Sequence, residues 1–367
     1  MKSQKLTRRC VLRSSMALAG AASVTSLAAP AISQGLRTIK LTLPWLANGS
    51  TLYTYVAKHQ GFFRKRGLEV NISRGYGSVA AAQAVAAHEF DFGVVFAGGT
   101  ILGAARGLPL VALSTLGYDA TMGITLRADS PITKPKDLEG KKLGTVVTSA
   151  ESPYWPAFAK QAGLDLQSIT MVQMDNRVLE QSVANKQVDG STAIGTSSIP
   201  VMYGMREPCR FMLWKSAGVE LYGGQIVTVQ DTFANNKSLC RDVVDALTEG
   251  LLFAMKDPAA GVDIFIKEVP EIGITTGGRE NAKLSQGLMH YTMLAPEAEE
   301  HALGYADLQK ASAMITMVME YGVPKDAKRP PVETLFSNDL IGDAKLSAAE
   351  WERAKQNVAE YARILGA

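Results

Sequence analysis

The sequence is poor in the residues that most often carry metal sites and nucleophilic chemistry. Its 367 residues include three cysteines and four histidines. The histidines form no H-E-x-x-H pair and no other spacing that binds a metal. G-x-S-x-G elbows and G-x-x-x-x-G-K-[ST] phosphate loops are also absent. These absences favour a protein that is not an enzyme and that has no catalytic residue, metal or cofactor.

Beyond the N-terminal segment, the sequence has no hydrophobic run long enough to span a bilayer. The N-terminus itself resembles a secretory signal peptide, because it has Lys and Arg without acids, an apolar run over 16–28, and the small-residue pattern Ala29-Pro30-Ala31. We therefore predict a signal peptide over 1–33, cleaved near Ala31 to Ser33, and a periplasmic protein. Residues 7–13 (TRRCVLR) resemble the twin-arginine export motif, with general secretory export as the alternative.

An excess of charge of one sign is also lacking. The whole chain has 38 Lys and Arg against 35 Asp and Glu. Loss of the five basic residues in the predicted signal leaves 33 basic residues and a net charge of −2. This balance lacks the basic excess typical of nucleic-acid binding, so we expect no nucleic-acid partner.

Cysteine pairing is left open by the sequence. Cys10 lies in the predicted signal peptide, which leaves Cys209 and Cys240 in the exported protein. An oxidising compartment permits a disulfide, but the distance between these two residues in space is not encoded in their spacing. Two separate buried thiols fit the sequence as well.

Signals for strands and helices alternate along two stretches of the chain. The first stretch has strands over 38–43, 68–73, 92–96 and 110–115, with helices over 50–60, 78–88 and from Thr100. The second has strands over 122–126, 143–148, 169–174 and 191–194, then returning strands over 211–214 and 225–230, before a mainly helical remainder. Because 367 residues exceed the roughly 250–300 that one core serves, we predict two α/β domains.

Several segments in this order resemble a known family. They are PWLANGSTLYTYVAKHQGFFRKRGLEVNI at 44–72, QAVAAHEFDFGVV at 83–95, DLEGKKLGT at 137–145 and GLLFAMKDPAAGVDIF at 250–265. Together they are similar to the solute-binding proteins of ABC importers, in the branch of nitrate, sulfonate, taurine, riboflavin and thiamine-pyrimidine-precursor binders.

The resemblance implies a periplasmic-binding-protein-like (type II) α/β fold with two lobes. Each lobe would have a mostly parallel sheet with helices on both faces, and the ligand cleft would lie between the lobes. Lobe 1 would comprise 34–118 plus 224–367, and lobe 2 would comprise 119–223. The resemblance also implies a monomer that closes on a small-molecule ligand and delivers it to an ABC permease in the inner membrane.

Four strand-to-helix junctions, at 43–51, 73–78, 96–100 and 148–155, share small or hydroxyl residues. In open α/β sheets ligands bind beyond the carboxyl ends of strands, where helix N-termini present free N–H groups. We therefore expect these junctions to converge on the cleft. The candidate ligand-binding residues are Trp45, Asn48, Tyr76, Gly77, Ser78, Gly98, Thr100, Tyr118, Asp119, Ser149, Glu151, Trp155, Asp175 and Thr196.

Structural roles compete with ligand binding at several of these positions. Trp45 either packs under its loop or forms a wall of the pocket. Residues 75–80 fit G-x-G-x-x-A, which suits a dinucleotide site, a loop close to a small ligand, or a plain turn. Asp119 and Glu151 either contact ligand or serve as turn and first-turn acids. Tyr154 and Trp155 are adjacent on a helix, so at most one should face the ligand.

The candidate loops contain little positive charge, since Arg74 and Arg177 are the only basic residues in them. Acids and aromatic rings fit a neutral, flat, nitrogen-rich molecule better, through hydrogen bonds and stacking. A sulfonate, taurine or nitrate ligand is the alternative within the family. An exported enzyme related to thiamine-pyrimidine synthases is the alternative of another class, but the cysteine-rich iron motif of those enzymes is missing.

Overall fold

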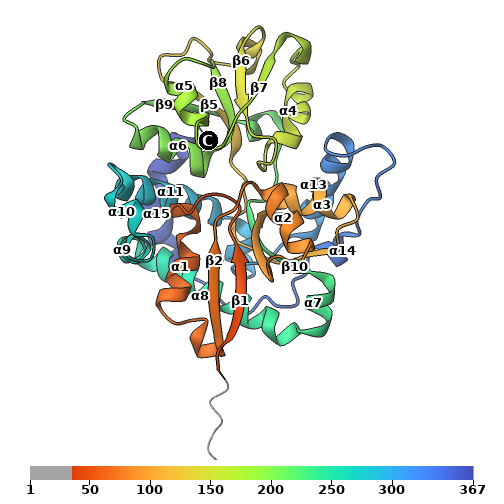
Figure 1. Cartoon of the computed structure of the whole chain (residues 1–367), viewed down its shortest axis with the longest axis vertical. Helices are drawn as coiled ribbons and strands as arrows, with labels where there is room; N and C mark the ends of the chain where they lie inside the picture. Colours follow the sequence, from red (N-terminus) through yellow and green to blue (C-terminus); the bar gives the residue numbers. More distant parts are fainter. Residues whose placement is uncertain (1–34, 367) are drawn as a thin grey trace, which may run out of the picture. The chain divides into compact units, whose positions relative to one another are not determined.

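The computed structural model describes residues 35–366, which contain two five-stranded sheets (Figure 1). In the first sheet the strand order is β2-β1-β3-β10-β4. Strand β1 runs parallel to β2 and β3, whereas β10 runs antiparallel to both β3 and β4. Four strands therefore point the same way and only β10 is reversed. The bounds are β1 Arg37–Thr42, β2 Leu68–Ser73, β3 Phe92–Phe96, β4 Leu110–Thr115 and β10 Gly224–Val229.

The second sheet repeats this arrangement with the order β7-β6-β8-β5-β9. Strand β6 is parallel to β7 and β8, and β5 is the reversed strand between β8 and β9. The expected α/β class with mostly parallel sheets is confirmed. The bounds are β5 Met122–Arg127, β6 Lys142–Thr145, β7 Thr170–Gln173, β8 Gly190–Ile194 and β9 Cys209–Leu213.

The chain passes between the sheets twice, over 116–121 and over 214–223. The second passage returns β10 to the middle of the first sheet, between β3 and β4. Both sheets belong to one compact unit that begins at Leu36. We call the elements around the first sheet lobe 1 and those around the second lobe 2; they occupy the lower and upper parts of Figure 1.

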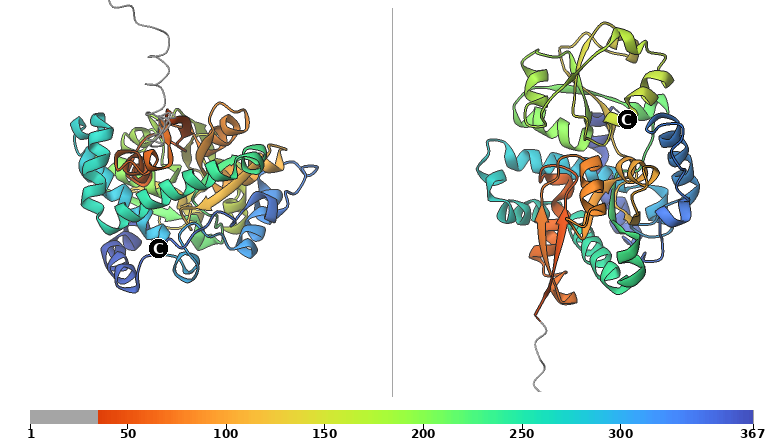
Figure 2. Two further views of the ribbon diagram at one scale, coloured as in Figure 1. Left: turned by 90° about the horizontal axis from the view of Figure 1, so that it is seen from below. Right: turned by 45° about the vertical axis from the view of Figure 1, so that its right-hand side comes forward.

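Helices cover both faces of each sheet, as the turned views in Figure 2 show. Some strands are buried on both faces under these helices; every residue of β4, for example, is buried. Around lobe 1 lie α1 Leu52–His59, α2 Ser78–Ala86, α3 Ala97–Ala105, α8 Lys237–Lys256, α9 Pro258–Glu268, α11 Gly278–Met293 and α13 Leu308–Tyr321. Around lobe 2 lie α4 Trp155–Gln161, α5 Leu179–Ala184 and α6 Gly195–Gly204.

The last helix, α15 (Ala348–Leu365), packs against both lobes. It begins with a capping box in which Ser347 and Glu350 exchange side-chain and backbone hydrogen bonds. Its buried residues recur every three or four positions and form one apolar stripe. Along that stripe, Val358, Tyr361 and Leu365 share an apolar cluster with Leu288 of lobe 1 and Phe211 of lobe 2.

Two local predictions at the lobe 2 junction need correction. The strand expected over 143–148 ends at Thr145, because the chain turns there and Ser149 N–H donates to the Val146 carbonyl (3.0 Å). As a serine ahead of a helix, Ser149 would also be expected to act as its N-cap, but its Oγ lies 2.8 Å from the Val146 carbonyl oxygen and 2.6 Å from Glu151 Oε1 instead. Pro153 lies in a short 3-10 helix, Ser152–Tyr154, that leads into α4.

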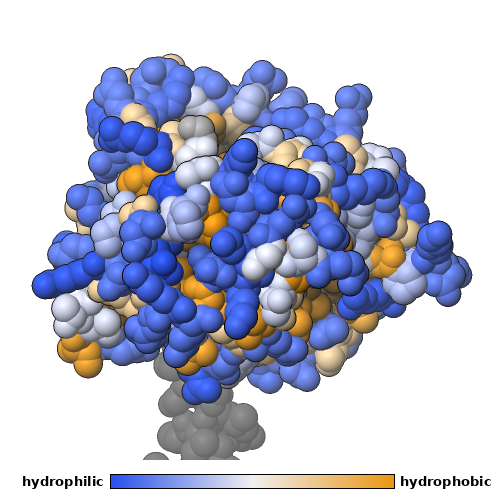
Figure 3. Space-filling view, turned by 90° about the horizontal axis from the view of Figure 1, so that it is seen from above, coloured by the Kyte–Doolittle hydropathy of each residue, from blue (hydrophilic) through white to orange (hydrophobic). Residues whose placement is uncertain are grey.

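The predicted signal peptide over 1–33 lies outside the described residues. Within the described part of the chain, every helix is too short or too polar to cross a membrane. The face drawn in Figure 3 is mainly hydrophilic, with apolar residues in small groups between polar ones.

Candidate functional site

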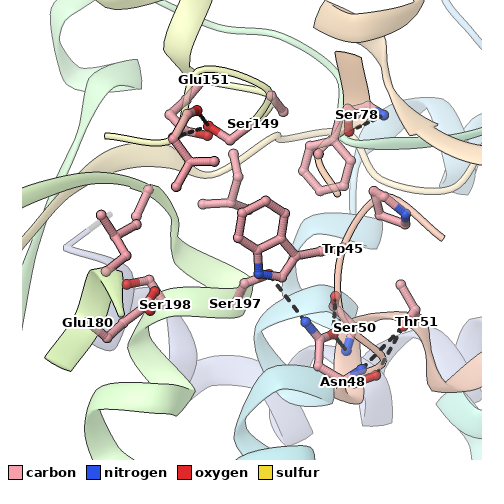
Figure 4. A pocket seen from close by; sticks show the side chains of 18 residues that line it. Trp45, Asn48, Ser50, Thr51, Ser78, Ser149, Glu151, Glu180, Ser197 and Ser198 are labelled. Atoms are coloured by element: carbon pink, nitrogen blue, oxygen red, sulfur yellow. Dashed lines mark hydrogen bonds between the residues drawn. The ribbon is translucent and has the colours of Figure 1, made fainter. Parts of the chain in front are cut away.

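A pocket lies between the two lobes and is lined by residues from both (Figure 4). Lobe 1 contributes the chain after β1, the start of α2 and the end of β3. Lobe 2 contributes the turn after β6 and the starts of α5 and α6. The lining residues are Pro44, Trp45, Asn48, Ser50, Thr51, Gly77, Ser78, Phe96, Val146, Ser149, Ala150, Glu151, Leu179, Glu180, Ala193, Ile194, Ser197 and Ser198.

The pocket forms at the carboxyl ends of the parallel strands, where the first turns of helices begin. Ser78 and Leu179 are the first residues of α2 and α5, and Ser197 is the third residue of α6. Parallel strands end at one edge of each sheet, and the two edges face each other across the cleft. Junctions far apart in the sequence are therefore brought together.

Two aromatic side chains, Trp45 and Phe96, line the lobe 1 side. Trp45 follows the buried Leu43 and Pro44, and its indole extends into the space between the lobes (Figure 4). Asn48 beside it is held by the Ser50 N–H, which donates to its Oδ1 (2.9 Å). Its amide nitrogen also donates across the cleft to Ser197 Oγ (3.3 Å). This corner thus offers a flat apolar surface next to a fixed amide.

Glu151 is the most buried charged side chain of the pocket, with 1% of its surface exposed. Its Oε1 accepts hydrogen bonds from Ser149 Oγ (2.6 Å) and from Thr192 Oγ1 (3.3 Å). Its Oε2 is buried and has no hydrogen-bond partner among the described residues. Burial raises the pKa of this carboxyl above its usual range, and the Ser149 bond opposes the rise in part.

A second carboxylate, Glu180, stands in the first turn of α5 and lines the same pocket. Burial, with a smaller contribution from the charge of Glu151, raises its pKa to about 7, although hydrogen bonds from its own backbone N–H and from Ser198 oppose part of the rise. The two acids come from different elements of lobe 2. They give the pocket two acidic groups, and burial raises the pKa of both.

No lysine, arginine or histidine occurs among the described residues that line the pocket. The two basic residues expected near it have other partners. The Arg74 guanidinium lies over the Tyr76 ring, 4.4 Å from its centroid. Arg177 pairs with Asp175, with 2.9 Å between Nε and Oδ1. The pocket is therefore acidic and aromatic, without a fixed cation.

Several contacts join the lobes directly around this pocket. Besides the Asn48 bond, Thr148 Oγ1 donates to the Tyr76 carbonyl (2.5 Å) and Ser285 Oγ donates to the Thr196 carbonyl (2.7 Å). Tyr154 of lobe 2 is fully buried, and its hydroxyl donates to the Gly98 carbonyl of lobe 1 (2.6 Å). The structure thus describes the lobes closed on each other.

Six of the predicted ligand residues line this pocket: Trp45, Asn48, Gly77, Ser78, Ser149 and Glu151. The G-x-G-x-x-A segment has a steric explanation. A Cβ on Gly77 would lie 1.9 Å from the Thr148 carbonyl oxygen of lobe 2, and one on Gly75 would lie 2.0 Å from the Leu43 oxygen. The glycines therefore allow close backbone approach, one of them across the cleft.

Four predicted residues lie beside the pocket without lining it. Tyr76 is 61% exposed at the junction with Thr148. Gly98 receives the Tyr154 hydroxyl, and Thr100 is fully buried within α3 with its hydroxyl directed to the Phe96 carbonyl. Thr196 is buried at the start of α6, where its carbonyl accepts from Ser285.

The other four predicted residues lie elsewhere. Tyr118 is buried against Tyr222, and its hydroxyl donates to the Tyr305 carbonyl (2.9 Å). Asp119 accepts from the Thr121 N–H and pairs with Lys215, in a different cavity. Trp155 packs in the core against Phe158 and Trp214. Asp175 is exposed and paired with Arg177, as described above. Neither Tyr154 nor Trp155 faces the pocket.

Sequence reasoning did not select Glu180, Ser197, Ser198, Ser50 or Phe96. A signal was present for two of them, Ser197 and Ser198. The segment 191–198 has the same order of strand, then small and hydroxyl residues, then helix, as the four junctions at 43–51, 73–78, 96–100 and 148–155. Glu180 has only a weak signal, because an acid in a first helical turn is common on any surface helix.

Comparison with known proteins agrees with this architecture. A family model described as "NMT1/THI5 like" matches residues 48–261. A relative named "Putative thiamine biosynthesis protein" from Haemophilus influenzae is 28% identical over 151 residues, which is 41% of this chain and 48%, about half, of that protein. A "Formylaminopyrimidine-binding protein" from Halalkalibacterium halodurans is 22% identical over 141 residues, covering 38% of this chain and 43% of that protein.

Among solved structures, the alkanesulfonate-binding protein from Xanthomonas axonopodis pv. citri bound to MOPS aligns with a TM-score of 0.63. The alignment covers 80% of this chain and 97% of that one at 13% identity. This likeness confirms the periplasmic-binding-protein-like fold that the sequence segments implied.

Proposed function

Because the chain belongs to the NMT1/THI5-like family, we propose that it is the solute-binding component of an ABC importer. It would capture a small organic solute outside the cytoplasm and hand it to a membrane permease. The observation that carries this proposal is the pocket itself. Its lining residues come from both lobes, and the lobes are joined around it by side chains such as Asn48 and Tyr154.

Closure of the lobes is the proposed mechanism, and no covalent bond is made or broken. A solute in the pocket touches residues of both lobes only when they are closed. Its binding therefore shifts the population toward the closed state. The two passages between the sheets, at 116–121 and 214–223, are where the backbone would bend.

For the solute, we favour a flat nitrogen-containing or aromatic molecule. Trp45 and Phe96 supply apolar surface on one side, and Glu151 and Glu180 supply hydrogen-bond acceptors on the other. The relative named for formylaminopyrimidine binding supports this preference. The absence of a basic side chain from the described lining speaks against the sulfonate, taurine or nitrate alternative, since oxyanions are best held by arginine, lysine or free N–H groups.

The alternative of an exported enzyme related to thiamine-pyrimidine synthases has less support. Cys209 and Cys240 are both free thiols, one beginning β9 in lobe 2 and the other within α8 in lobe 1. Two thiols on different lobes do not form a cysteine-rich iron site. Metal analysis and a visible spectrum of the purified protein would test this alternative, because bound iron would favour it.

Isothermal titration calorimetry tests the proposed function, with a panel of aminopyrimidines, aromatic amines, flavins, alkanesulfonates and nitrate. We expect saturable binding by a member of the nitrogen-containing group. Trp45→Ala should weaken that binding, and Tyr203→Ala, which removes a half-exposed ring outside the pocket, is the matched control. If no compound binds, and mass spectrometry of the denatured protein releases no solute, the proposal is wrong.

A further inference from the structure

We propose that the solute carries a positive charge and that Glu151 and Glu180 select it. This inference rests on the proposed function and specifies the solute class for the same pocket. It differs from the neutral solute expected from the sequence, because the second carboxylate, Glu180, was not among the residues selected there.

Glu151 provides the first argument, because one of its oxygens lacks a donor. The side chain is almost completely buried, and Oε1 already receives the Ser149 and Thr192 hydroxyls. Oε2 receives nothing from the described residues. A buried acceptor without a hydrogen bond is costly, so a missing donor is expected to come from what fills the pocket.

Glu180 provides the second argument, because it adds another carboxylate without adding a counter-charge. Neither acid forms a salt bridge with a described basic residue, although ion pairs are common on the rest of the protein, as between Glu268 and Lys58. Two carboxylates that line one pocket, one of them almost completely buried and the other partly exposed, repel each other unless a cation or a proton lies between them. A cationic solute would satisfy both.

Several N–H groups at the helix starts around the pocket already donate to acceptors within the protein. Ser50 N–H donates to Asn48 Oδ1 and to Ser285 Oγ. Val79 N–H near the start of α2 donates to the Thr148 carbonyl, and Thr196 N–H at the start of α6 donates to Thr121 Oγ1. These N–H groups are committed to the protein, so they offer less to an oxyanion than free helix ends would.

The aromatic side chains of the pocket further restrict the chemical class of the solute. An indole such as Trp45 attracts a cation to its face and stacks on flat groups. A planar cation would use both properties, while its N–H groups donate to the carboxylates. The chemical class is therefore a small amidine or a protonated amino-heterocycle, in which the charge and the donors lie in the plane of the ring or next to it.

Three probes of similar shape and different charge test the inference: benzamidine (+1), benzamide (0) and benzoate (−1). In calorimetry at pH 7.5, benzamidine should bind at least about tenfold more tightly than benzamide, because its charge is paired with the carboxylates of the pocket. Benzoate should show no measurable binding. Glu151→Gln and Glu180→Gln should each weaken benzamidine about tenfold or more, and change benzamide by less than about threefold. Glu89→Gln, the same change on an exposed surface position, should alter neither.

Circular dichroism would show whether the glutamine variants fold. If Glu151→Gln does not fold, the affinities of Glu180→Gln alone test the inference. Equal binding of benzamidine and benzamide, or tighter benzoate, would overturn the charge inference while leaving the solute-binding function intact. If none of the probes binds, the charge of the solute released from the denatured protein tests the inference. A cationic solute that binds Glu180→Gln more weakly supports the inference, and a neutral or anionic solute overturns it. No solute at all would count against the proposed function itself.

Discussion

Tyr154 crosses from lobe 2 into lobe 1, so a small change at Gly98 should separate closure from folding. Gly98 is the second residue of α3, and a Cβ there would lie 2.5 Å from Tyr154 Cε2. Within lobe 1 alone, Gly98→Ala should be neutral or stabilising, because alanine is favoured over glycine in a helix by about 1 kcal/mol. In the closed arrangement the methyl group overlaps a ring that is fully buried.

Most of the expected cost falls on closure, although the new methyl group would also lie 3.1 Å from Leu221 Cδ1 in the second passage between the sheets. Forcing a methyl group into a packed contact costs about 1–3 kcal/mol, and the Tyr154–Gly98 hydrogen bond is weakened as well. Since solute binding is coupled to closure, a cost of about 1–3 kcal/mol corresponds to roughly 5- to 150-fold weaker solute affinity. Calorimetry with a bound solute or benzamidine measures the affinity. Small-angle scattering should show a larger radius of gyration.

Gly103→Ala is the matched control, because it makes the same change in the same helix but meets Leu110 of lobe 1, a contact within one lobe. It should leave affinity unchanged. Tyr154→Leu combined with Gly98→Ala should recover part of the lost affinity by removing the ring. The reasoning is refuted if Gly98→Ala binds as tightly as the parent protein and shows the same scattering profile.

Three further predictions follow from the site and its surroundings. Trp45→Ala should weaken the binding of a flat aromatic solute by about 1–3 kcal/mol, as measured by calorimetry. The melting temperature, measured by differential scanning fluorimetry, should fall by no more than a few degrees because the indole is only half-buried. Unchanged affinity would show that Trp45 does not contact the solute. Burial by the pocket walls, with Glu151 as the charged neighbour, raises the pKa of Glu180 from 4.5 to about 7. The folded state therefore holds this proton more tightly than the unfolded chain does. The resulting stabilisation is lost as pH rises from about 4.5 to above 7. Glu180→Gln should therefore raise the melting temperature of the solute-free protein more at pH 8 than at pH 5, and an equal shift at both pH values would contradict the assignment. Because Cys209 and Cys240 are free and lie in different lobes, dithiothreitol should not change the melting temperature, and a thiol reagent should label both cysteines after denaturation without reduction.

Local sequence signals were enough to predict most of the strands and much of the pocket's location. Strands such as 68–73 and 92–96 were predicted with the observed bounds, because their apolar runs and flanking turns are local signals. The rule that ligands lie beyond strand ends then pointed to Trp45, Ser78 and Glu151, which do line the pocket. Only local chain geometry and strand direction are needed for that step.

Which side chains meet at those junctions depends on how distant segments pack together. Glu151 and Glu180 belong to different elements, and they share a pocket because β6 and β7, the strands that precede them, are parallel neighbours that end at the same sheet edge. Asp119, by contrast, follows a strand end yet faces another cavity, because the chain is already passing between the lobes there. The direction of a side chain at a junction depends on packing between distant segments, so the local hydrophobic pattern does not predict it.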